Sequence, residues 1–377
     1  MLVPRWIYFL VPAFFVECAA FMLALAQPID ALERFHANGF QLGLLGMLSN
    51  GGYAAMALVA GRLSDRTGRR PWMLAGLAAQ IALALLMPVS NSFVFLLAVS
   101  ALQLTLLGCF WAPFIGTLSD ATTPAAMSAV LARFNISWCI GAMLGSTTNS
   151  VLYEMLGTRA PYLGAAAYFC VALAVLTLTR PASGQIAKPE QLEIHPRVGH
   201  YKILAWLALS SNFFVAGMLV YLFPYLAASG PTPLAPEFIS GLHVFRLGAM
   251  LATFAAMGAT RVWHFSPGPY HAAYGLLILM LLLTATVHHP LLLALPFVGV
   301  GVALGMAYAL SIYYSTLEPE KGSNLGFHEA LLALGATTGP IYGGVLMKLT
   351  GRPDVAFWLG ALPLMAVWTI HIIIRRR

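Results

Sequence analysis

The sequence predicts an all-α integral membrane protein whose twelve transmembrane helices form two pseudo-symmetric six-helix bundles. Three observations support this fold class. First, 60% of the 377 residues are hydrophobic and only 9% are charged, whereas soluble domains contain about 45–50% apolar and about 25% charged residues. Second, apolar runs long enough to cross a bilayer, which takes roughly 20 residues, recur along the whole chain. Third, one polar stretch divides these runs six and six.

The apolar runs place the helices in order along the chain. In the first bundle, residues 1–180, we expect helices over residues 6–27, 41–60, 72–88, 93–117, 127–152 and 160–179. Residues 181–201 are polar and are expected to form a linker. In the second bundle, residues 202–377, we expect helices over residues 202–227, 237–258, 269–287, 291–315, 326–347 and 353–374.

The distribution of positive charge predicts the orientation. With the N-terminus in the cytoplasm, the inner side receives fourteen basic residues: Arg5, Arg62, Arg66, Arg69, Arg70, Arg180, Lys188, Arg197, Lys202, Arg261, Lys321 and Arg375–Arg377. The outer side receives four: Arg34, Arg159, Lys348 and Arg352. Because loops rich in Lys and Arg stay in the cytoplasm, we expect both termini there. We expect the membrane to be a bacterial inner membrane.

Composition excludes several functions. The net charge of +7 does not indicate nucleic-acid binding, because the basic residues lie at the ends of apolar runs and form no continuous face. No G-x-x-x-x-G-K-[ST] loop occurs, so ATP is not the direct energy source. The four cysteines all fall in apolar runs and are expected to be buried as small hydrophobes. We therefore expect no metal site and no cofactor.

A short charged segment separates the second and third apolar runs. Five charges fall within the eleven residues from Gly61 to Pro71, between the run that ends at Ala60 and the run that begins at Trp72. A hairpin that only follows the positive-charge bias would explain the arginines. That bias does not explain Asp65 or the two glycines. The pattern G-x-x-x-D-R-x-G-R-R is formed by Gly61, Asp65, Arg66, Gly68, Arg69 and Arg70.

This pattern resembles the signature loop between the second and third helices of the major facilitator superfamily. The resemblance implies that Asp65 lies at the end of helix 2, near the N-terminus of helix 11, and helps to hold the inner gate closed. A carboxylate is favourable at the positive end of a helix dipole. An acidic residue at the inner end of helix 4 often completes a charge relay in that family, so we expect Asp120 to pair with Arg69. The alternative for Asp120 is a carboxylate exposed to water at a helix end.

An internal repeat supports two related bundles. Glycines at 141, 145 and 157 recur 194 residues later at 335, 339 and 351, as expected for transporters built from structural repeats. A glycine-rich motif in the eleventh helix is formed by Gly335, Gly339, Pro340, Gly343 and Gly344. It is similar to a motif that drug and proton antiporters of the superfamily carry in helix 5, but here that helix has only a degenerate copy. The motif predicts either close helix packing or a bendable helix 11 at Pro340.

The ionisable residues within the apolar runs are the candidates for coupling. A charged group at membrane depth is costly and marks a functional hypothesis. Glu17 lies near the middle of helix 1, where it either carries a proton or substrate or forms a structural hydrogen bond. Arg246, with His243 one turn earlier in helix 8, needs an anion, which is a carboxylate or the substrate. A second cluster is predicted towards the inner end of the seam between the bundles, formed by Arg133, Asn135, His328 and Glu329. Two carboxyls and two arginines then balance.

In the superfamily, helices 1, 4, 7 and 10 line the central cavity. By this resemblance the cavity-lining candidates are Gln103, Trp111, Asn212, Tyr221, Tyr225, Tyr308, Ser311, Tyr314 and Ser315. Aromatic residues at these positions are alternatively explained by packing or by the interfacial aromatic belt.

The sequence thus predicts a secondary active transporter, not an enzyme, that moves a small molecule by alternating access. We expect it to act as a monomer within the lipid bilayer and to couple transport to protons or another ion. One alternative is a scaffold or sensor that keeps the fold without transport. A membrane-embedded lipid enzyme is the least favoured, because the adjacent pair His288 and His289 has no carboxylate nearby in the sequence.

Overall fold

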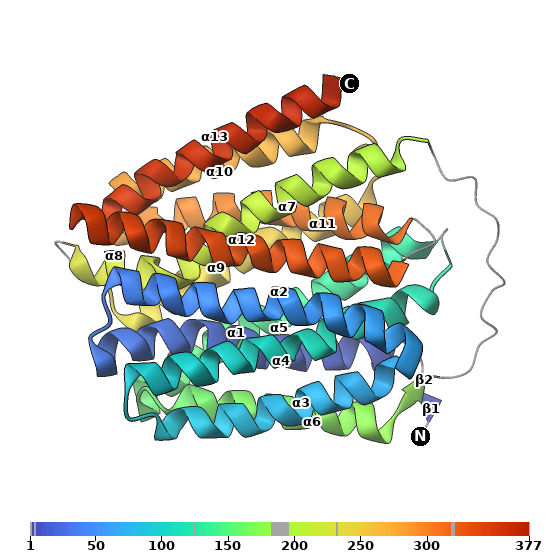
Figure 1. The fold of residues 1–377 in the computed structure, drawn as a ribbon, viewed down its shortest axis with the longest axis horizontal. Helices are drawn as coiled ribbons and strands as arrows, with labels where there is room; N and C mark the ends of the chain where they lie inside the picture. Colours follow the sequence, from blue (N-terminus) through green and yellow to red (C-terminus); the bar gives the residue numbers. More distant parts are fainter. Residues whose placement is uncertain are drawn as a thin grey trace.

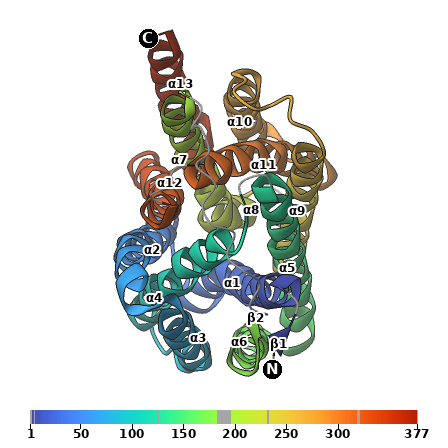
Figure 2. The same cartoon turned by 90° about the vertical axis from the view of Figure 1, so that its right-hand side faces the viewer.

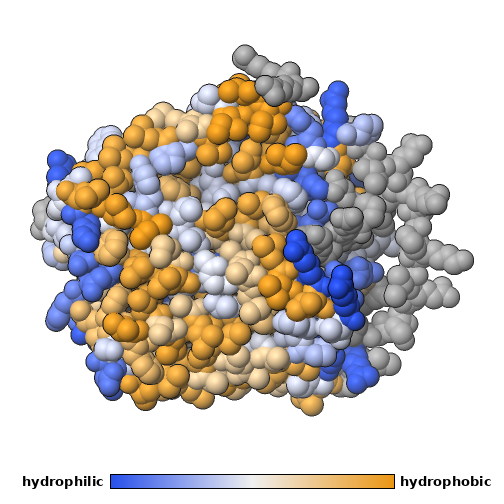
Figure 3. Space-filling model, in the orientation of Figure 1, coloured by the Kyte–Doolittle hydropathy of each residue, from blue (hydrophilic) through white to orange (hydrophobic). Residues whose placement is uncertain are grey.

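The computed structural model describes residues 2–3, 5–123, 126–181, 196–230, 233–317 and 321–376. Within these residues, twelve helices are long and apolar enough to cross a membrane, as the sequence predicts. Both chain ends lie towards the same end of the helices, on the right in Figure 1. We call this the terminal end and the opposite end the distal end. Hydrophobic side chains cover most of the surface between the two ends in the view of Figure 3, with hydrophilic residues gathered at the ends.

The helices alternate in direction between the two ends. The first half of the chain contains α1 (Arg5–Phe35), α2 (Gly39–Thr67), α3 (Arg69–Leu86), the 3-10 turn η1 (Met87–Val89), α4 (Phe93–Asp120), α5 (Met127–Leu156) and α6 (Ala160–Leu178). The second half contains α7 (Val198–Tyr221), α8 (Phe223–Ser229), α9 (Pro236–Ala259), α10 (Gly268–Thr286), η3 (Pro290–Leu293), α11 (Ala294–Thr316), α12 (Lys321–Thr350) and α13 (Asp354–Arg376). Short strands β1 (Leu2–Val3) and β2 (Arg180–Pro181) pair in parallel.

Helix boundaries differ from the prediction where polar residues or proline intervene. The helix predicted to end at residue 27 continues to Phe35, because Asp30 is buried and paired there: it accepts a hydrogen bond from Tyr162 and forms an ion pair with Arg34 at 3.0 Å. The seventh predicted helix is broken at Leu222, two residues before Pro224, which cannot donate a backbone hydrogen bond. Most of the predicted linker, residues 182–195, lies outside the described residues, and its end belongs to α7.

Two helix pairs join the halves. Figure 2, seen from the terminal end, shows α1, α3, α4 and α6 on one side and α7, α10, α11 and α13 on the other, with α2 beside α12 and α5 beside α9. The helices α2 and α12 run antiparallel along their whole length. A Cβ at Gly43 would lie 2.5 Å from the carbonyl oxygen of Pro340, and one at Gly344 would lie 2.9 Å from that of Gly39. Glycine is required at these positions because the backbones touch.

The internal repeat corresponds to equivalent packing in each half. Gly141 and Gly145 of α5 lie against the carbonyl oxygens of α1, and Gly335 and Gly339 of α12 lie against those of α7, where an added Cβ would come within 2.2 Å. Small residues at this spacing allow close helix contact. The helix α12 is continuous through Pro340, so these glycines serve packing in this structure. A hinge at Pro340 stays a prediction.

Candidate functional site

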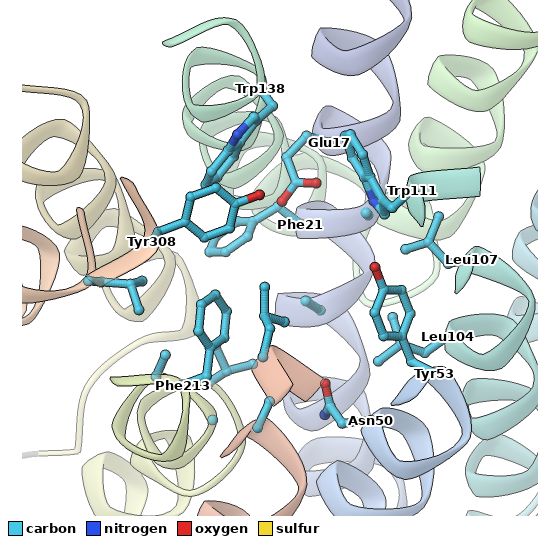
Figure 4. Close-up of a pocket in the computed structure, with 18 of the residues that line it drawn as sticks. Glu17, Phe21, Asn50, Tyr53, Leu104, Leu107, Trp111, Trp138, Phe213 and Tyr308 are labelled. Carbon is cyan, nitrogen blue, oxygen red and sulfur yellow. The ribbon is translucent and has the colours of Figure 1, made fainter. Parts of the chain in front are cut away.

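A cavity of about 210 Å³ lies between the two halves, near mid-depth of the helices. Helices α1, α2, α4 and α5 of the first half line it together with α7, α9, α11 and α12 of the second. Most of the lining side chains are apolar or aromatic (Figure 4). Within the described part of the chain, its charged members are Glu17, Arg246 and Glu329. A mainly apolar pocket with a few convergent polar groups is the usual form of a small-molecule site.

Glu17 projects into this cavity from the middle of α1. Figure 4 shows its carboxylate among the rings of Trp111, Trp138 and Tyr308, with the Tyr308 hydroxyl pointing towards it. Glu17 is half-buried, and it makes no hydrogen bond or ion pair with any residue that the structure describes. The sequence predicts an ionisable group at this depth, and the structure places the group at the centre of the seam.

Arg246 lies opposite on α9 and is almost completely covered. Its Nε donates to Nδ1 of His243 at 3.2 Å, and its guanidinium carbon lies 5.4 Å from the centre of the Phe21 ring. Among the described residues, no carboxylate comes within ion-pair distance of Arg246. His243 is buried behind it, with its ring 5.0 Å from that of Phe297, and does not line the cavity.

Glu329 does not lie where the sequence analysis places it. It was expected towards the terminal end, in a separate cluster, but it lines the same cavity as Glu17. The reason is that α12 begins at Lys321, five residues before the predicted start, so Glu329 is more than two turns into the helix. The Tyr53 hydroxyl donates to Oε2 of Glu329 at 2.5 Å and thereby joins α2 to α12. His328 Nε2 is 3.8 Å from Oε1, and Nδ1 of His328 bonds the Ser311 hydroxyl at 2.8 Å.

The other two members of the predicted second cluster lie elsewhere. Arg133 is exposed on the surface of α5, so it does not balance a carboxyl in the cavity. Asn135 is buried, accepts a hydrogen bond from Trp138 Nε1 at 3.2 Å and lines a smaller cavity of about 20 Å³ between α5, α9 and α11. The predicted charge balance is therefore wrong: of the residues that the structure describes, two carboxyls and one guanidinium line the central cavity.

Three of the nine predicted cavity residues line the central cavity: Trp111, Tyr221 and Tyr308. The other six make contacts elsewhere. Gln103 bonds Gln27 and Gln80 inside the first half, and Tyr225 lies on α8 at the distal end. Asn212 donates to Ala208 O, Ser311 bonds His328, Tyr314 accepts from Phe265 N, and Ser315 accepts from Trp206.

Sequence reasoning missed three lining residues whose side chains carry a polar atom. Asn50 and Tyr53 of α2 and Trp138 of α5 line the cavity, and Asn50 Nδ2 lies 3.4 Å from the Tyr221 hydroxyl across the two halves. They lie on the second and fifth spanning helices, whereas the family resemblance implies a cavity lined by the first, fourth, seventh and tenth. The available signal was the presence of these polar groups within the long apolar runs of the second and fifth helices.

The charged segment at residues 61–71 is almost entirely helical, not the loop that the sequence predicts. The helix α2 ends at Thr67 and α3 begins at Arg69, and only Gly68 separates them, with φ of +90°. Arg69 pairs with Asp65 at 2.8 Å and with Asp120 at 2.7 Å, which is the pairing expected for Asp120. Arg70 donates to the carbonyl oxygens of Thr177 and Thr179 at the end of α6.

This ionic group lies near the terminal end of the α2–α12 seam. A Cβ at Gly326 would lie 3.4 Å from the Ala57 carbonyl oxygen and 3.9 Å from Cα of Gly61. Asp65 is one turn beyond Gly61 on α2, so the antiparallel register brings it level with the first turn of α12. A carboxylate there is favourable for the positive end of the α12 dipole.

The corresponding turn of the second half, between α9 and α10, uses aromatic residues. Trp263 Nε1 donates to the carbonyl oxygens of Met257 at 2.8 Å and Thr260 at 2.9 Å. The His264 ring stacks on that of Tyr313, with ring centres 4.5 Å apart. Burial, with a further contribution from the Arg261 charge, lowers the pKa of His264. The His264 ring is therefore uncharged near neutral pH.

Comparisons with known proteins agree with this architecture. A family model described as the Major Facilitator Superfamily matches residues 10–314. A sequence search of curated proteins gave no match.

Two solved structures share the fold. The human organic anion transporter MFSD10 (TETRAN) is 17% identical, with a TM-score of 0.68 over 97% of this chain and 98% of that one. A bacterial homologue of the human lysosomal transporter Spinster, solved in an inward-facing and occupied conformation, is 12% identical, with a TM-score of 0.74 over 99% of this chain and 96% of that one. At these identities the likeness shows the fold alone.

Proposed function

This chain belongs to the Major Facilitator Superfamily, and we propose that it is a secondary active transporter that moves a small molecule by alternating access and couples transport to protons. Family and fold make it a membrane transport protein and not an enzyme. The observation that carries the proposal is the central cavity, in which Glu17 of the first half faces Arg246 and Glu329 of the second. A site shared by two halves is what a rocking mechanism requires.

The seams suggest how access would alternate. At the distal end, Ser146 donates to Ser240 O at 2.7 Å and Asn149 donates to the Ser240 hydroxyl at 3.0 Å, between α5 and α9. At the terminal end, α2 and α12 meet at Gly61 and Gly326, beside the ionic group of Arg69. In our proposal, one set of contacts opens while the other holds, and the ionic group keeps the terminal end closed.

Proton coupling is assigned to the two cavity carboxyls. The Glu329 carboxylate accepts the Tyr53 hydrogen bond that crosses between the halves, and protonating it would remove the charge that strengthens this bond. Glu17, which makes no such bond in the described chain, is proposed as the site that binds and releases the transported proton. We propose a monomer in a bacterial inner membrane, with the basic terminal end in the cytoplasm.

The test begins with a ligand. Purified protein is screened by thermal shift against amphipathic drugs, sugars, organic anions and amino acids at two pH values, because a ligand that binds only the native state raises its stability. The ligand found is then used in proteoliposomes with and without a pH gradient. We expect accumulation to depend on the gradient in the wild type and to lose that dependence in Glu17→Gln, while exchange of the ligand continues.

The matched control is Glu154→Gln, since Glu154 is exposed on α5 and lies outside the cavity. Unchanged proton coupling in Glu17→Gln would remove Glu17 as the carrier. Binding without any flux under all gradients would contradict the proposal and favour a transport-inactive scaffold or sensor.

A further inference from the structure

Among the described residues, acidic groups in the central cavity outnumber basic ones, and the acidic and basic groups differ in how far a ligand can reach them. Two carboxyls, Glu17 and Glu329, and one guanidinium, Arg246, line it among the described residues. Arg133, the other arginine expected near this depth, is exposed on α5. With both carboxyls ionised, the cavity has a net charge of −1, so a ligand with one positive charge would balance it.

The guanidinium of Arg246 is largely covered and so is poorly accessible to a ligand. Arg246 is only 3% exposed, because the Phe21 ring covers its guanidinium at 5.4 Å and its Nε is engaged by His243. An anionic ligand would therefore reach little of the guanidinium and would meet the Glu17 carboxylate instead. Like charges in a cavity of low dielectric repel each other strongly.

The two carboxyls, Glu17 and Glu329, differ in how far other protein groups already engage them. One oxygen of Glu329 already accepts the hydrogen bond from Tyr53 at 2.5 Å, and the other faces His328 at 3.8 Å. Glu17 has no hydrogen-bond partner in the part of the chain that the structure describes, and its carboxylate points into the cavity (Figure 4). Glu17 is the charged group that a ligand would contact first.

Aromatic rings from different helices surround this carboxylate. Trp111 comes from α4, Trp138 from α5 and Tyr308 from α11, and the rings of Trp138 and Tyr308 are 5.2 Å apart (Figure 4). Aromatic faces attract organic cations, most strongly in the case of Trp. Most of the remaining wall, including Leu104 and Phe213, is apolar and would cover an uncharged body.

We propose that the transported substrate is a compact organic monocation with an apolar body, its charged centre against Glu17 and the rings of Trp111, Trp138 and Tyr308. This proposal rests on the transport function assigned above to the same cavity. It deepens that function by naming the ligand chemistry.

The test compares matched probes on purified full-length protein in lipid nanodiscs, using equilibrium dialysis. The probes are benzyltrimethylammonium and tetraphenylphosphonium as monocations, benzyl alcohol as a neutral probe and phenylacetate as an anion. We expect at least one monocation to bind at least tenfold more tightly than the neutral probe and the anion. In Glu17→Gln the affinity for the monocation falls by about tenfold, and in Trp138→Leu by a few fold to about tenfold, as the loss of one cation–π contact predicts. Glu154→Gln is the control and leaves the affinity unchanged.

The outcomes separate this inference from the proposed function. If the monocation binds through Glu17 but proteoliposomes show no flux, the ligand class stands and the transport function fails. If flux of another solute is found while phenylacetate binds more tightly than the cations, the transport function stands and the inference is overturned. Absence of binding by both cations, or equal binding by wild type and Glu17→Gln when size-exclusion profiles match, also overturns it.

Discussion

The two turns at the terminal end, one in each half, are held together by different chemistry. Between α2 and α3 a single glycine forms the turn, and Arg69 pairs with Asp65 and Asp120. Between α9 and α10, residues 260–267 form the turn, and buried Trp263 anchors it by two hydrogen bonds to backbone carbonyls. The first turn is ionic and partly exposed. The second is held by a buried aromatic ring.

This difference indicates which turn can be released. Asp65 is 39% and Asp120 is 59% exposed, and exposed ion pairs contribute only about 0.2–1 kcal/mol each and weaken with salt. Trp263 is 6% exposed, and removing a buried Trp costs about 3–5 kcal/mol. The ionic turn is therefore suited to open and close, whereas the aromatic turn is suited to stay in place.

The largest effect is expected on stability at the aromatic turn. Trp263→Ala should lower the free energy of unfolding by about 3–5 kcal/mol, because it removes a buried ring and leaves two carbonyls without a donor. The measurement is the melting temperature in detergent. The control is Trp358→Ala, since Trp358 is 41% exposed on α13. Equal losses in the two variants would show that Trp263 is not an anchor.

The next effect is expected on transport at the ionic turn. Asp65→Asn removes the charge that pairs with Arg69, and we expect transport to slow by about tenfold, equivalent to about 1.4 kcal/mol, while the melting temperature changes little. The initial rate of transport in proteoliposomes measures this slowing. Asp354→Asn, which breaks the ion pair with Arg352 at the distal end, serves as the control. Full activity in Asp65→Asn would remove its gating role.

A smaller effect is expected for the coupling energy between Arg69 and Asp120. A double-mutant cycle with Arg69→Gln and Asp120→Asn should give a coupling energy of about 0.2–1 kcal/mol. The coupling should fall when salt is raised from 0.1 M to 1 M, because the Debye length shrinks from about 10 Å to about 3 Å. A coupling that does not change with salt would mean that packing of Arg69 over Gly116 accounts for the interaction.

The smallest effect concerns pH at the aromatic turn. Burial lowers the pKa of His264 below its ordinary 6.5, so on acidification the unfolded chain takes up a proton before the folded chain does. Stability contributed by His264 is therefore present above pH 6.5 and lost as pH falls below it. The melting temperature of His264→Gln should decline less between pH 7.5 and pH 5.5 than that of the wild type. His289→Gln, at the exposed distal end, should behave like the wild type.

Several features of the protein could be predicted from sequence. Twelve apolar runs predict twelve spanning helices because every backbone polar group in a bilayer must be bonded within its own segment. The charged pattern around Asp65 indicates the family, and the repeat of Gly141 at Gly335 predicts equivalent packing in the two halves. The pairing of Arg69 with Asp120 is what the resemblance to that family implies, and the structure contains it.

Only the tertiary structure decided which charges share one cavity. Apolar periodicity shows that a residue lies in a membrane helix, but it does not give the rotation and depth of that helix against its neighbours. Glu329 was expected near the terminal end and Arg133 beside it, yet α12 packs so that Glu329 meets Tyr53, and α5 turns Arg133 outward. A helix turns 100° for each residue, so a shift of two residues changes the face that a side chain presents. The cavity with two carboxyls and one covered guanidinium thus depends on contacts between helices.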